Sequence, residues 1–312
     1  MLYQYARILD VCEPYLIAHR GVVDELNRCP LGVQIRDELV FDPQLRRNGA
    51  FLALLHKLDA LTLGPLGMTM PSWVFYDCAV MPGAFFGLGI RRDRLERWAL
   101  EALGVPDDYD GLVPVSQCIA IPKLAAFAPD PAVAGGEAAA TTSQTLPETL
   151  PEALPETLPE TWLLYSLESI NQVSPGFAPA GLLKLTLALG LAVFPIKRLY
   201  GVTQWRSPKL DAYIDLGPIE LMTAYTPAHS LPRTLTFRLQ QGEIMLETLL
   251  TSPRVHPLAA APDTLLDPDD PAALIALQHK IEAGWRVRVV GHPMTHGSQI
   301  RVPLAMTPPE GR

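Results

Sequence analysis

The sequence predicts a domain of the α/β or α+β class with a mixed sheet, and two observations carry this prediction. After residue 161, runs typical of strands alternate with runs typical of helices. One of the helical runs, GLLKLTLALGLAVF at 181–194, is apolar on nearly every side. Such a helix has to be covered all round, as happens when it packs on a sheet beneath other elements.

Composition and charge narrow the class of protein. The chain has 312 residues, of which 48% are hydrophobic and 19% are charged, so it can bury a sizeable core. The net charge of −8 argues against nucleic acid or an anionic membrane as the main partner. We therefore expect a small-molecule substrate as the partner, while composition leaves the oligomeric state open.

Cysteine spacing and hydropathy predict a cytoplasmic protein with structural thiols. The four cysteines form no C-x-x-C pair on which a zinc site is commonly built. The N-terminus, MLYQYARILDVCEPYL, contains an arginine and two acids where a signal peptide has an apolar core. The longest apolar run, LALGLAVFPI at 187–196, is too short to span a bilayer, so no membrane span is expected.

Residues 1–70 are predicted to be an N-terminal helical region. Residues 1–29 place apolar side chains at helical spacing, with Pro14 breaking the run. The mixed period of 32–42 allows a strand. Residues 43–64 predict an amphipathic helix that Pro43 opens and a glycine ends.

Residues 71–240 are predicted to form the mixed core. SWVFYDCAV at 72–80 and AFFGLGI at 84–90 predict two strands joined by a Met-Pro-Gly turn at 81–83. RRDRLERWALEALGV at 91–105 predicts an amphipathic helix ended by Gly104, and GLVPVSQCIAIPK at 111–123 predicts a further strand.

A linker of different composition interrupts this core at 131–161. It contains TLPETLPEALPETLPE, four copies of a tetrapeptide in which proline and glutamate recur at every fourth position. Proline at this density excludes helix and ladder hydrogen bonds, so the segment is predicted to be extended, solvated and acidic. It is either a peptide docking arm or a tandem expansion tolerated in a surface loop.

Beyond the linker the predicted order is regular. Strands are expected at 161–173, 198–205, 219–225 and 233–239, a helix at 181–194, and a short helix at 207–217 that Ser207 and Pro208 begin. A C-terminal extension at 241–312 is predicted to contain one helix at 271–285 and one strand at 286–292.

The run from 162 to 221 resembles the second half of a GCN5-related N-acetyltransferase domain. In that family a strand leads to a glycine-rich loop and a helix, followed by a second strand, a short helix bearing a tyrosine, a glycine and a third strand. The matching pieces are LLYSLESINQV, SPGFAPAG, LLKLTLALGLAVF, RLYGVTQW, SPKLDAYIDLG and IELMTAY. The resemblance implies an α+β (α/β-like) fold with a mixed, largely antiparallel sheet flanked by helices and an N-terminal helical extension.

The resemblance also implies an acyltransferase that uses acetyl-CoA or another acyl-CoA and acts on a small-molecule or amine acceptor. The loop at 174–181 would hold the diphosphate, since a helix N-terminus offers unpaired N–H groups and small residues let the backbone approach. The small residues are Gly176, Ala178, Ala180 and Gly181, and Lys184 is the first basic residue after them. Because Pro175 and Pro179 lack an N–H, the loop can equally be a tight turn without a ligand.

Two residues are candidates for catalysis. Tyr213 stands where the family's tyrosine often protonates the departing thiolate, and a phenol near pKa 10 suits that role. It can also be an ordinary tyrosine half-buried against a sheet. Glu168 is the one carboxylate in an otherwise uncharged strand. Facing a cleft it would take a proton from an incoming amine, and facing solvent it would be an ordinary outward position.

Alternative interpretations use the same residues differently. The chain can be a non-catalytic α/β protein that binds a small apolar ligand or a partner chain. VFDPQLRRNGAFLALL at 40–55, with Arg46 and Arg47, is a rival phosphate loop if the segment at 73–80 is the next strand. Weaker candidates are His292 and His296 at metal-like spacing, Cys78 beside Asp77, and His229 at a strand end.

Overall fold

The computed structural model describes residues 5–19, 23, 26–67, 69–80, 85–122, 160–194, 196–215, 217, 219–225, 234–240 and 261–309. The predicted linker at 131–161 lies outside these residues except for its last two, as do His229 and the predicted turn at 81–83.

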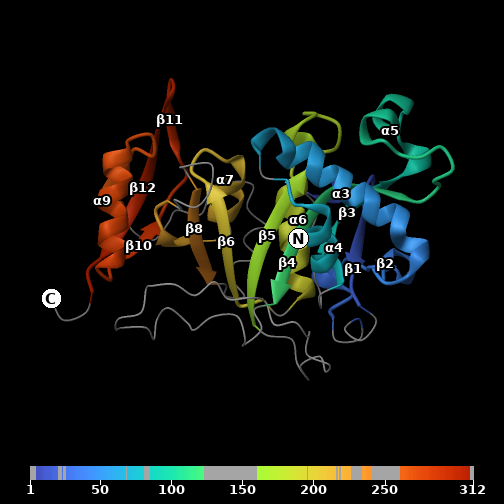
Figure 1. The fold of residues 1–312 in the computed structure, drawn as a ribbon, viewed down its shortest axis with the longest axis horizontal. Coiled ribbons are helices and arrows are strands. Elements are labelled where there is room, and N and C mark those ends of the chain that lie inside the picture. Colours follow the sequence, from blue (N-terminus) through green and yellow to red (C-terminus); the bar gives the residue numbers. More distant parts are fainter. Residues whose placement is uncertain are drawn as a thin grey trace.

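The described strands form one sheet of twelve, which is mixed and mostly antiparallel (Figure 1). The order is β11-β12-β10-β7-β8-β6-β5-β4-β3-β1-β2, and β9 pairs with β12. Only β1–β2 and β5–β6 are parallel pairs among these strands. The bounds are β1 Glu13–Ile17, β2 Val40–Phe41, β3 Phe85–Arg91, β4 Leu112–Pro122, β5 Thr161–Ser169, β6 Arg198–Gln204, β7 Ile219–Thr223, β8 Thr234–Gln240, β9 Thr264–Leu266, β10 Arg286–Val289, β11 Met294–His296 and β12 Gln299–Thr307.

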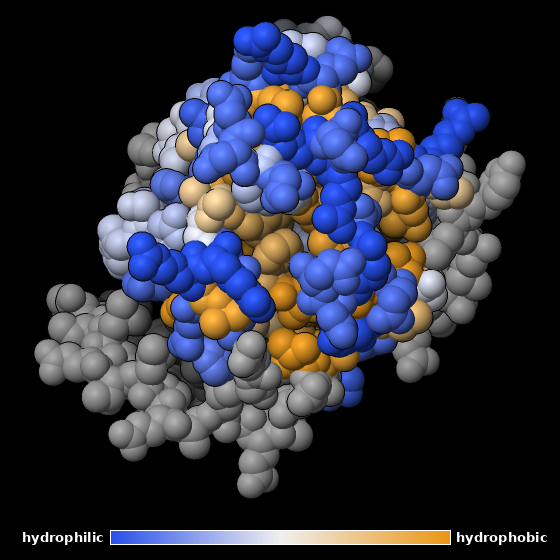
Figure 2. Space-filling model, turned by 90° about the vertical axis from the view of Figure 1, so that its right-hand side faces the viewer, coloured by the Kyte–Doolittle hydropathy of each residue, from blue (hydrophilic) through white to orange (hydrophobic). Residues whose placement is uncertain are grey.

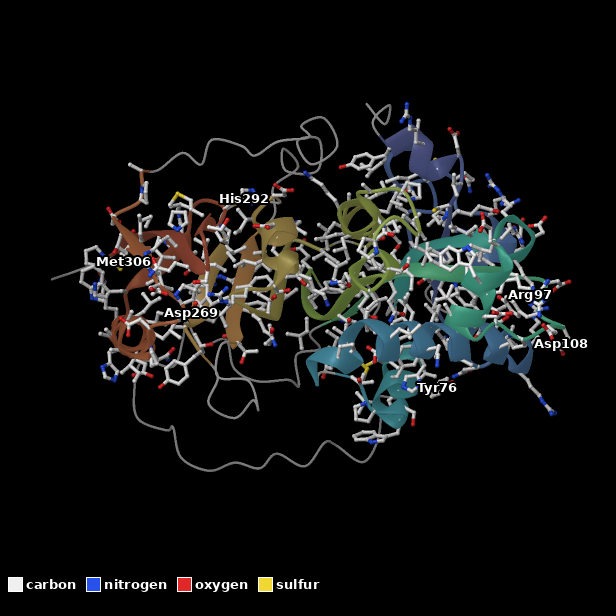
Figure 3. All side chains as sticks on the ribbon, turned by 90° about the horizontal axis from the view of Figure 1, so that it is seen from above. Tyr76, Arg97, Asp108, Asp269, His292 and Met306 are labelled. Atoms are coloured by element: carbon white, nitrogen blue, oxygen red, sulfur yellow. The ribbon has the colours of Figure 1, made fainter. Side chains whose placement is uncertain are left out.

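Helices cover both faces of the sheet. α6 contacts β3, β4 and β5 from one side, whereas α3 contacts β4 and β5 from the other (Figure 3). The protein is therefore of the α+β class with a mixed, largely antiparallel sheet flanked by helices, as the sequence predicts. The helix bounds are α1 Ala6–Leu9, α3 Gly49–Leu63, α4 Ser72–Val80, α5 Arg97–Leu103, α6 Leu182–Val193, α7 Pro208–Ile214 and α9 Pro271–Glu282.

Local signals place the ends of several elements correctly. Ser207 caps α7, because its Oγ accepts a hydrogen bond from the Lys209 N–H at 3.2 Å. Gly104 ends α5 in the left-handed region with φ +62°, where glycine is favoured. The helix predicted at 91–105 starts later than expected, since residues 92–94 form a separate 3-10 turn.

The strand predicted at 72–80 is wrong, because this segment is the helix α4. Phe75, Cys78 and Ala79 are buried, whereas Trp73 and Tyr76 are exposed, which is the spacing of a helix face. A short apolar run does not distinguish a strand from a buried helix, so the packing of α4 decides its structure. The rival phosphate loop at 40–55 loses the strand that it required.

The N-terminal region contains a strand that the sequence analysis did not predict. Pro14 lies inside β1, which pairs with β2 on one side and β3 on the other. The Tyr15 hydroxyl donates a hydrogen bond of 2.8 Å to the carbonyl of Ser116 on β4, across the intervening strand. The possible strand at 32–42 contains one 3-10 turn, Asp37–Leu39, and only Val40–Phe41 joins the sheet.

The C-terminal extension continues the same sheet. Its described part contains α9 and the strands β9 to β12, where one strand was predicted. β10 pairs antiparallel with β7. Across this junction Glu220 accepts a hydrogen bond of 3.2 Å from Arg286 of β10, and it accepts another of 2.9 Å from Arg238 of the core strand β8. The ion pair with Arg286 joins the extension to the core.

The surface mixes polar and apolar residues. Seen from the β1–β2 end, hydrophobic residues appear between hydrophilic ones (Figure 2). Within the described ranges, no helix combines the length and the hydropathy that crossing a bilayer requires.

Candidate functional site

The two parallel strands β5 and β6 separate at one end. They pair only from Thr161–Leu164 with Arg198–Gly201, although β5 continues to Ser169 and β6 to Gln204. At the point of separation Tyr165 is an extra residue in β5, because Leu164 faces Ala120 and Ser166 faces Ile119 on β4. Such a bulge bends a strand and can end its pairing. The bulge at Tyr165 thus lies where the pairing of β5 with β6 ends, at Leu164.

A cavity of about 70 Å³ lies where the strands separate. Its lining includes Ser166 and Thr203 from the two strands and Lys209 and Tyr213 from α7. Lys209 and Tyr213 are four residues apart and so lie on one face of that helix. Since one water occupies about 30 Å³ of liquid, the cavity accommodates a small chemical group and not a whole cofactor.

A larger cavity of about 440 Å³ lies beside β1 and β2, at one edge of the sheet. Arg28, Asp37, Asp42 and Arg47 contribute to its lining. Arg28 is 2.5 Å from Asp37, so part of this charge is already paired. The smaller cavity is lined by the buried Lys209 and Tyr213 and by Ser166, which is hydrogen-bonded to the buried Glu168, so we take it as the candidate site.

Glu168 is completely buried beside the small cavity. Its Oε2 accepts hydrogen bonds from Thr62 Oγ1 at 2.8 Å and Gln117 Nε2 at 3.0 Å. Its Oε1 accepts a hydrogen bond from Ser166 Oγ, and Ser166 lines the cavity. Of the two orientations open from the sequence, exposure to solvent is excluded. The side chain reaches the cavity through Ser166.

A second buried carboxyl group lies next to Glu168. Asp59 is on α3 one turn before Thr62, and its Oδ2 accepts a hydrogen bond of 2.9 Å from the Met70 N–H. Burial, followed by the charge of Glu168, raises the pKa of Asp59 to about 8. The carboxyl group of Asp59 therefore holds a proton at neutral pH, when an isolated aspartic acid would be ionised.

Lys209 is the cation of this site. Burial lowers the pKa of its ammonium group, and the charges of Glu168 and Asp59 oppose that effect. The site thus combines two carboxyl groups and one amine from α3, β5 and α7. Groups of this kind move protons when a substrate reaches them.

Tyr213 is buried in the wall of the cavity. Its ring lies 4.8 Å from the ring of Phe237 on β8. Burial raises the pKa of its hydroxyl, and the charges of Cys118 and Glu168 add to the shift. The phenol therefore stays protonated at physiological pH, and it is a weaker acid than the phenol near pKa 10 that the sequence analysis considered.

The side chain of Asn171 makes hydrogen bonds across the loop between β5 and α6. Asn171 Oδ1 accepts the N–H of Ala178 at 2.9 Å, and Asn171 Nδ2 donates to the carbonyl oxygen of Ala178 at 2.8 Å. The amide of Ala178 is therefore not available to a ligand. The exposed Gly176, Ala180 and Gly181 have amides without an acceptor among the residues that the structure describes.

Lys184 points away from this loop. Its Nζ lies 2.8 Å from Asp215 Oδ2, just beyond α7. His292 of the C-terminal extension binds the same cluster, with Nδ1 3.0 Å from Asp211 Oδ1 and Nε2 3.2 Å from Asp215 Oδ1. Figure 3 places His292 beside α7. Lys184, the predicted phosphate-binding cation, is thus part of an ion-pair cluster that connects α6, α7 and the C-terminal extension.

We expect His292 to make stability depend on pH. Asp211 and Asp215 raise the pKa of His292 to about 9, against 6.5 in an unfolded chain. This contribution is complete below pH 6.5 and is lost as the pH rises through about 9. In urea unfolding, the free energy of unfolding of His292→Gln should fall less steeply between pH 6.5 and about 9 than that of the unmodified protein. The exposed His279→Gln serves as the control, and parallel profiles for the protein and His292→Gln would contradict the expectation.

The weaker sequence candidates find no support as reactive sites. Burial raises the pKa of Cys78 to about 11, so its thiol is not activated. Within the described residues no three His, Cys, Asp or Glu side chains gather as metal ligands would. The His296 side chain lies outside the described atoms.

Sequence reasoning missed Asp59, Thr62, Gln117 and Lys209 as members of the site. One signal was present in the helix at 43–64. Asp59 and Thr62 are polar and three residues apart on a face that is otherwise leucine-rich. Polar residues on such a face require partners when buried, so this pattern indicates a buried polar contact.

Comparison with known proteins adds no relative. The chain matches no family model and no curated protein sequence.

Proposed function

We propose that this protein is an acyltransferase that uses an acyl-CoA, such as acetyl-CoA, to acylate an amine or another small-molecule acceptor. The observation that carries the proposal is the separation of β5 and β6 around a cavity, with Glu168 reaching one side and Tyr213 lining it. The order of strand, loop, helix, strand, short tyrosine-bearing helix and strand from 161 to 223 adds support.

The chemistry assigns one proton to each residue. The acceptor nitrogen attacks the thioester carbonyl carbon and gives its proton to Glu168 through the Ser166 hydroxyl or water. The carbon–sulfur bond then breaks, and the leaving thiolate takes the proton of Tyr213. The thioester would lie between the separated strands. The diphosphate would bind the exposed amides of Ala180 and Gly181 at the start of α6.

A second function has a specific observation in its favour. The Ala178 amide already binds Asn171, and Pro175 and Pro179 have no N–H, so few donors remain in the loop. This favours a non-catalytic α/β protein that binds a small apolar ligand or a partner chain.

Coenzyme A binding separates the two functions. We expect acetyl-CoA, a longer acyl-CoA or free coenzyme A to raise the melting temperature in a thermal-shift assay. A ligand at a hundredfold excess over its dissociation constant stabilises a protein by about 2.7 kcal/mol, a shift of several degrees. If isothermal titration detects no binding at millimolar ligand, the acyltransferase proposal fails and the binding function is preferred.

The role of Tyr213 has its own test. Tyr213→Phe should leave coenzyme A affinity almost unchanged and lower kcat by roughly a hundredfold or more, because the phenol matters only as the thiolate leaves. Tyr225→Phe, two residues beyond β7 and not among the residues that line the cavity, is the matched control. An unchanged kcat in Tyr213→Phe would remove Tyr213 from the mechanism.

A further inference from the structure

The polar cluster between α3 and the sheet has one buried acceptor atom without a partner. Asp59 is completely buried, and its Oδ1 has no hydrogen-bond donor in the part of the chain that the structure describes. Leaving a carboxylate oxygen in this state costs a large desolvation free energy. Asp59 Oδ1 therefore needs either a donor or a proton of its own.

The two carboxyl groups accept different numbers of hydrogen bonds. Glu168 accepts hydrogen bonds from Thr62, Gln117 and Ser166, and hydrogen bonds to the charged form stabilise it. Asp59 accepts one, from the Met70 amide. If the pair holds one proton, that proton belongs on Asp59, because Glu168 has more donors to stabilise its ionised form.

We infer that Asp59 and Glu168 share one proton, held on Asp59 Oδ1 and donated to the Glu168 carboxylate. Asp59 then donates a hydrogen bond to the Glu168 carboxylate and so holds that carboxylate in position. The catalytic use of this pair rests on the proposed function, in which Glu168 takes the proton of the acceptor amine. The sharing of the proton does not rest on it.

The other ionisable groups around the pair do not change the placement of the proton on Asp59. Lys209 of α7 is the nearby cation and offsets the single negative charge of the pair. Cys118 of β4, Tyr15 of β1 and Tyr213 of α7 face the same cluster, and burial raises the pKa of all three, so they are neutral. The pKa of Asp59, raised to about 8 by burial and by Glu168, agrees with one proton at neutral pH.

The direct test is infrared spectroscopy of the unmodified protein. We expect the carbonyl stretch of a protonated carboxyl group at pH 7, which disappears as the pH rises through about 8 and is absent in Asp59→Asn. Asp42→Asn, at the other end of the sheet, should keep the band. Absence of the band at pH 7 in the unmodified protein, or its persistence in Asp59→Asn, would overturn the inference.

A second readout uses stability. The pKa of Asp59 is raised from 3.8 in the unfolded chain, so its contribution is complete below about pH 4 and is lost as the pH rises through about 8. The unfolding constant of the protein should therefore rise relative to that of Asp59→Asn by up to tenfold per pH unit in this range. A constant ratio would contradict the shared proton.

These tests are independent of coenzyme A binding. If the infrared band behaves as expected and coenzyme A does not bind, the shared proton stands and the acyltransferase proposal fails. If the protein is active, its kcat/KM should change with pH near pH 8, and this change should disappear in Asp59→Asn. The variant should still be active at alkaline pH, because it retains Glu168. Retention of that change in Asp59→Asn would contradict the positioning role of Asp59.

Discussion

Replacing Leu187 by aspartate should leave the protein unfolded. Leu187 lies in the middle of α6 and is only 1% exposed. The helix packs on β3, β4 and β5, and the 3-10 turn Pro30–Gly32 and α7 also contact it. Residues 185–191 of α6 are all buried, and Lys184, one turn before Leu187, is already paired with Asp215. An unpaired buried charge costs several kcal/mol, against a total stability of roughly 5–15 kcal/mol.

Circular dichroism and size-exclusion chromatography measure this outcome. Ile275→Asp on α9 is the control, because Ile275 is 45% exposed and its replacement should leave the fold unchanged. A soluble Leu187→Asp variant with the helical content of the original protein would show that α6 is not buried as described.

Replacing Gly87 by alanine should cost about 3 kcal/mol or more of folding free energy. A Cβ at this position of β3 would lie 2.1 Å from the carbonyl oxygen of Ser116 and 2.4 Å from the hydroxyl of Tyr15. Those two atoms form the hydrogen bond that crosses β3. Overpacking costs about 1–3 kcal/mol, and leaving two buried polar groups unpaired costs a similar amount.

Gly49→Ala provides the matched control. Gly49 begins α3 with a helical φ of −59°, and no atom lies within 4 Å of the Cβ that alanine would add. Alanine there should be neutral or stabilise by up to about 1 kcal/mol, since it reduces the freedom of the unfolded chain. Urea unfolding of both variants measures the difference. Equal stability of the two would contradict the close approach of Tyr15 to Gly87.

Elements with strong local signals were predicted from the sequence. The helix α6 follows from a run that is apolar on nearly every side, and α7 from its Ser-Pro start. The strands β5, β6 and β7 lie within the predicted ranges. Local spacing specifies these elements because their caps, turns and periodicity agree with the fold around them.

Elements with weak local signals depended on their neighbours. β1 is a five-residue strand containing Pro14, and α4 is a nine-residue helix of mostly apolar residues. Each sequence fits more than one secondary structure. Pairing with β2 and β3 selects the strand in the first case, and burial of Phe75 selects the helix in the second.

The sequence by itself determined the fold class, the β5 to β7 run and the positions of Glu168 and Tyr213 within it. Only the tertiary structure decided what surrounds Glu168, because Thr62 is 106 residues away in the chain and Asp59 lies on the same distant helix. It also assigned Lys184 to Asp215 and the Ala178 amide to Asn171. Burial and partners of a charged group depend on contacts between distant segments, and these set its pKa, whereas residue type and spacing do not.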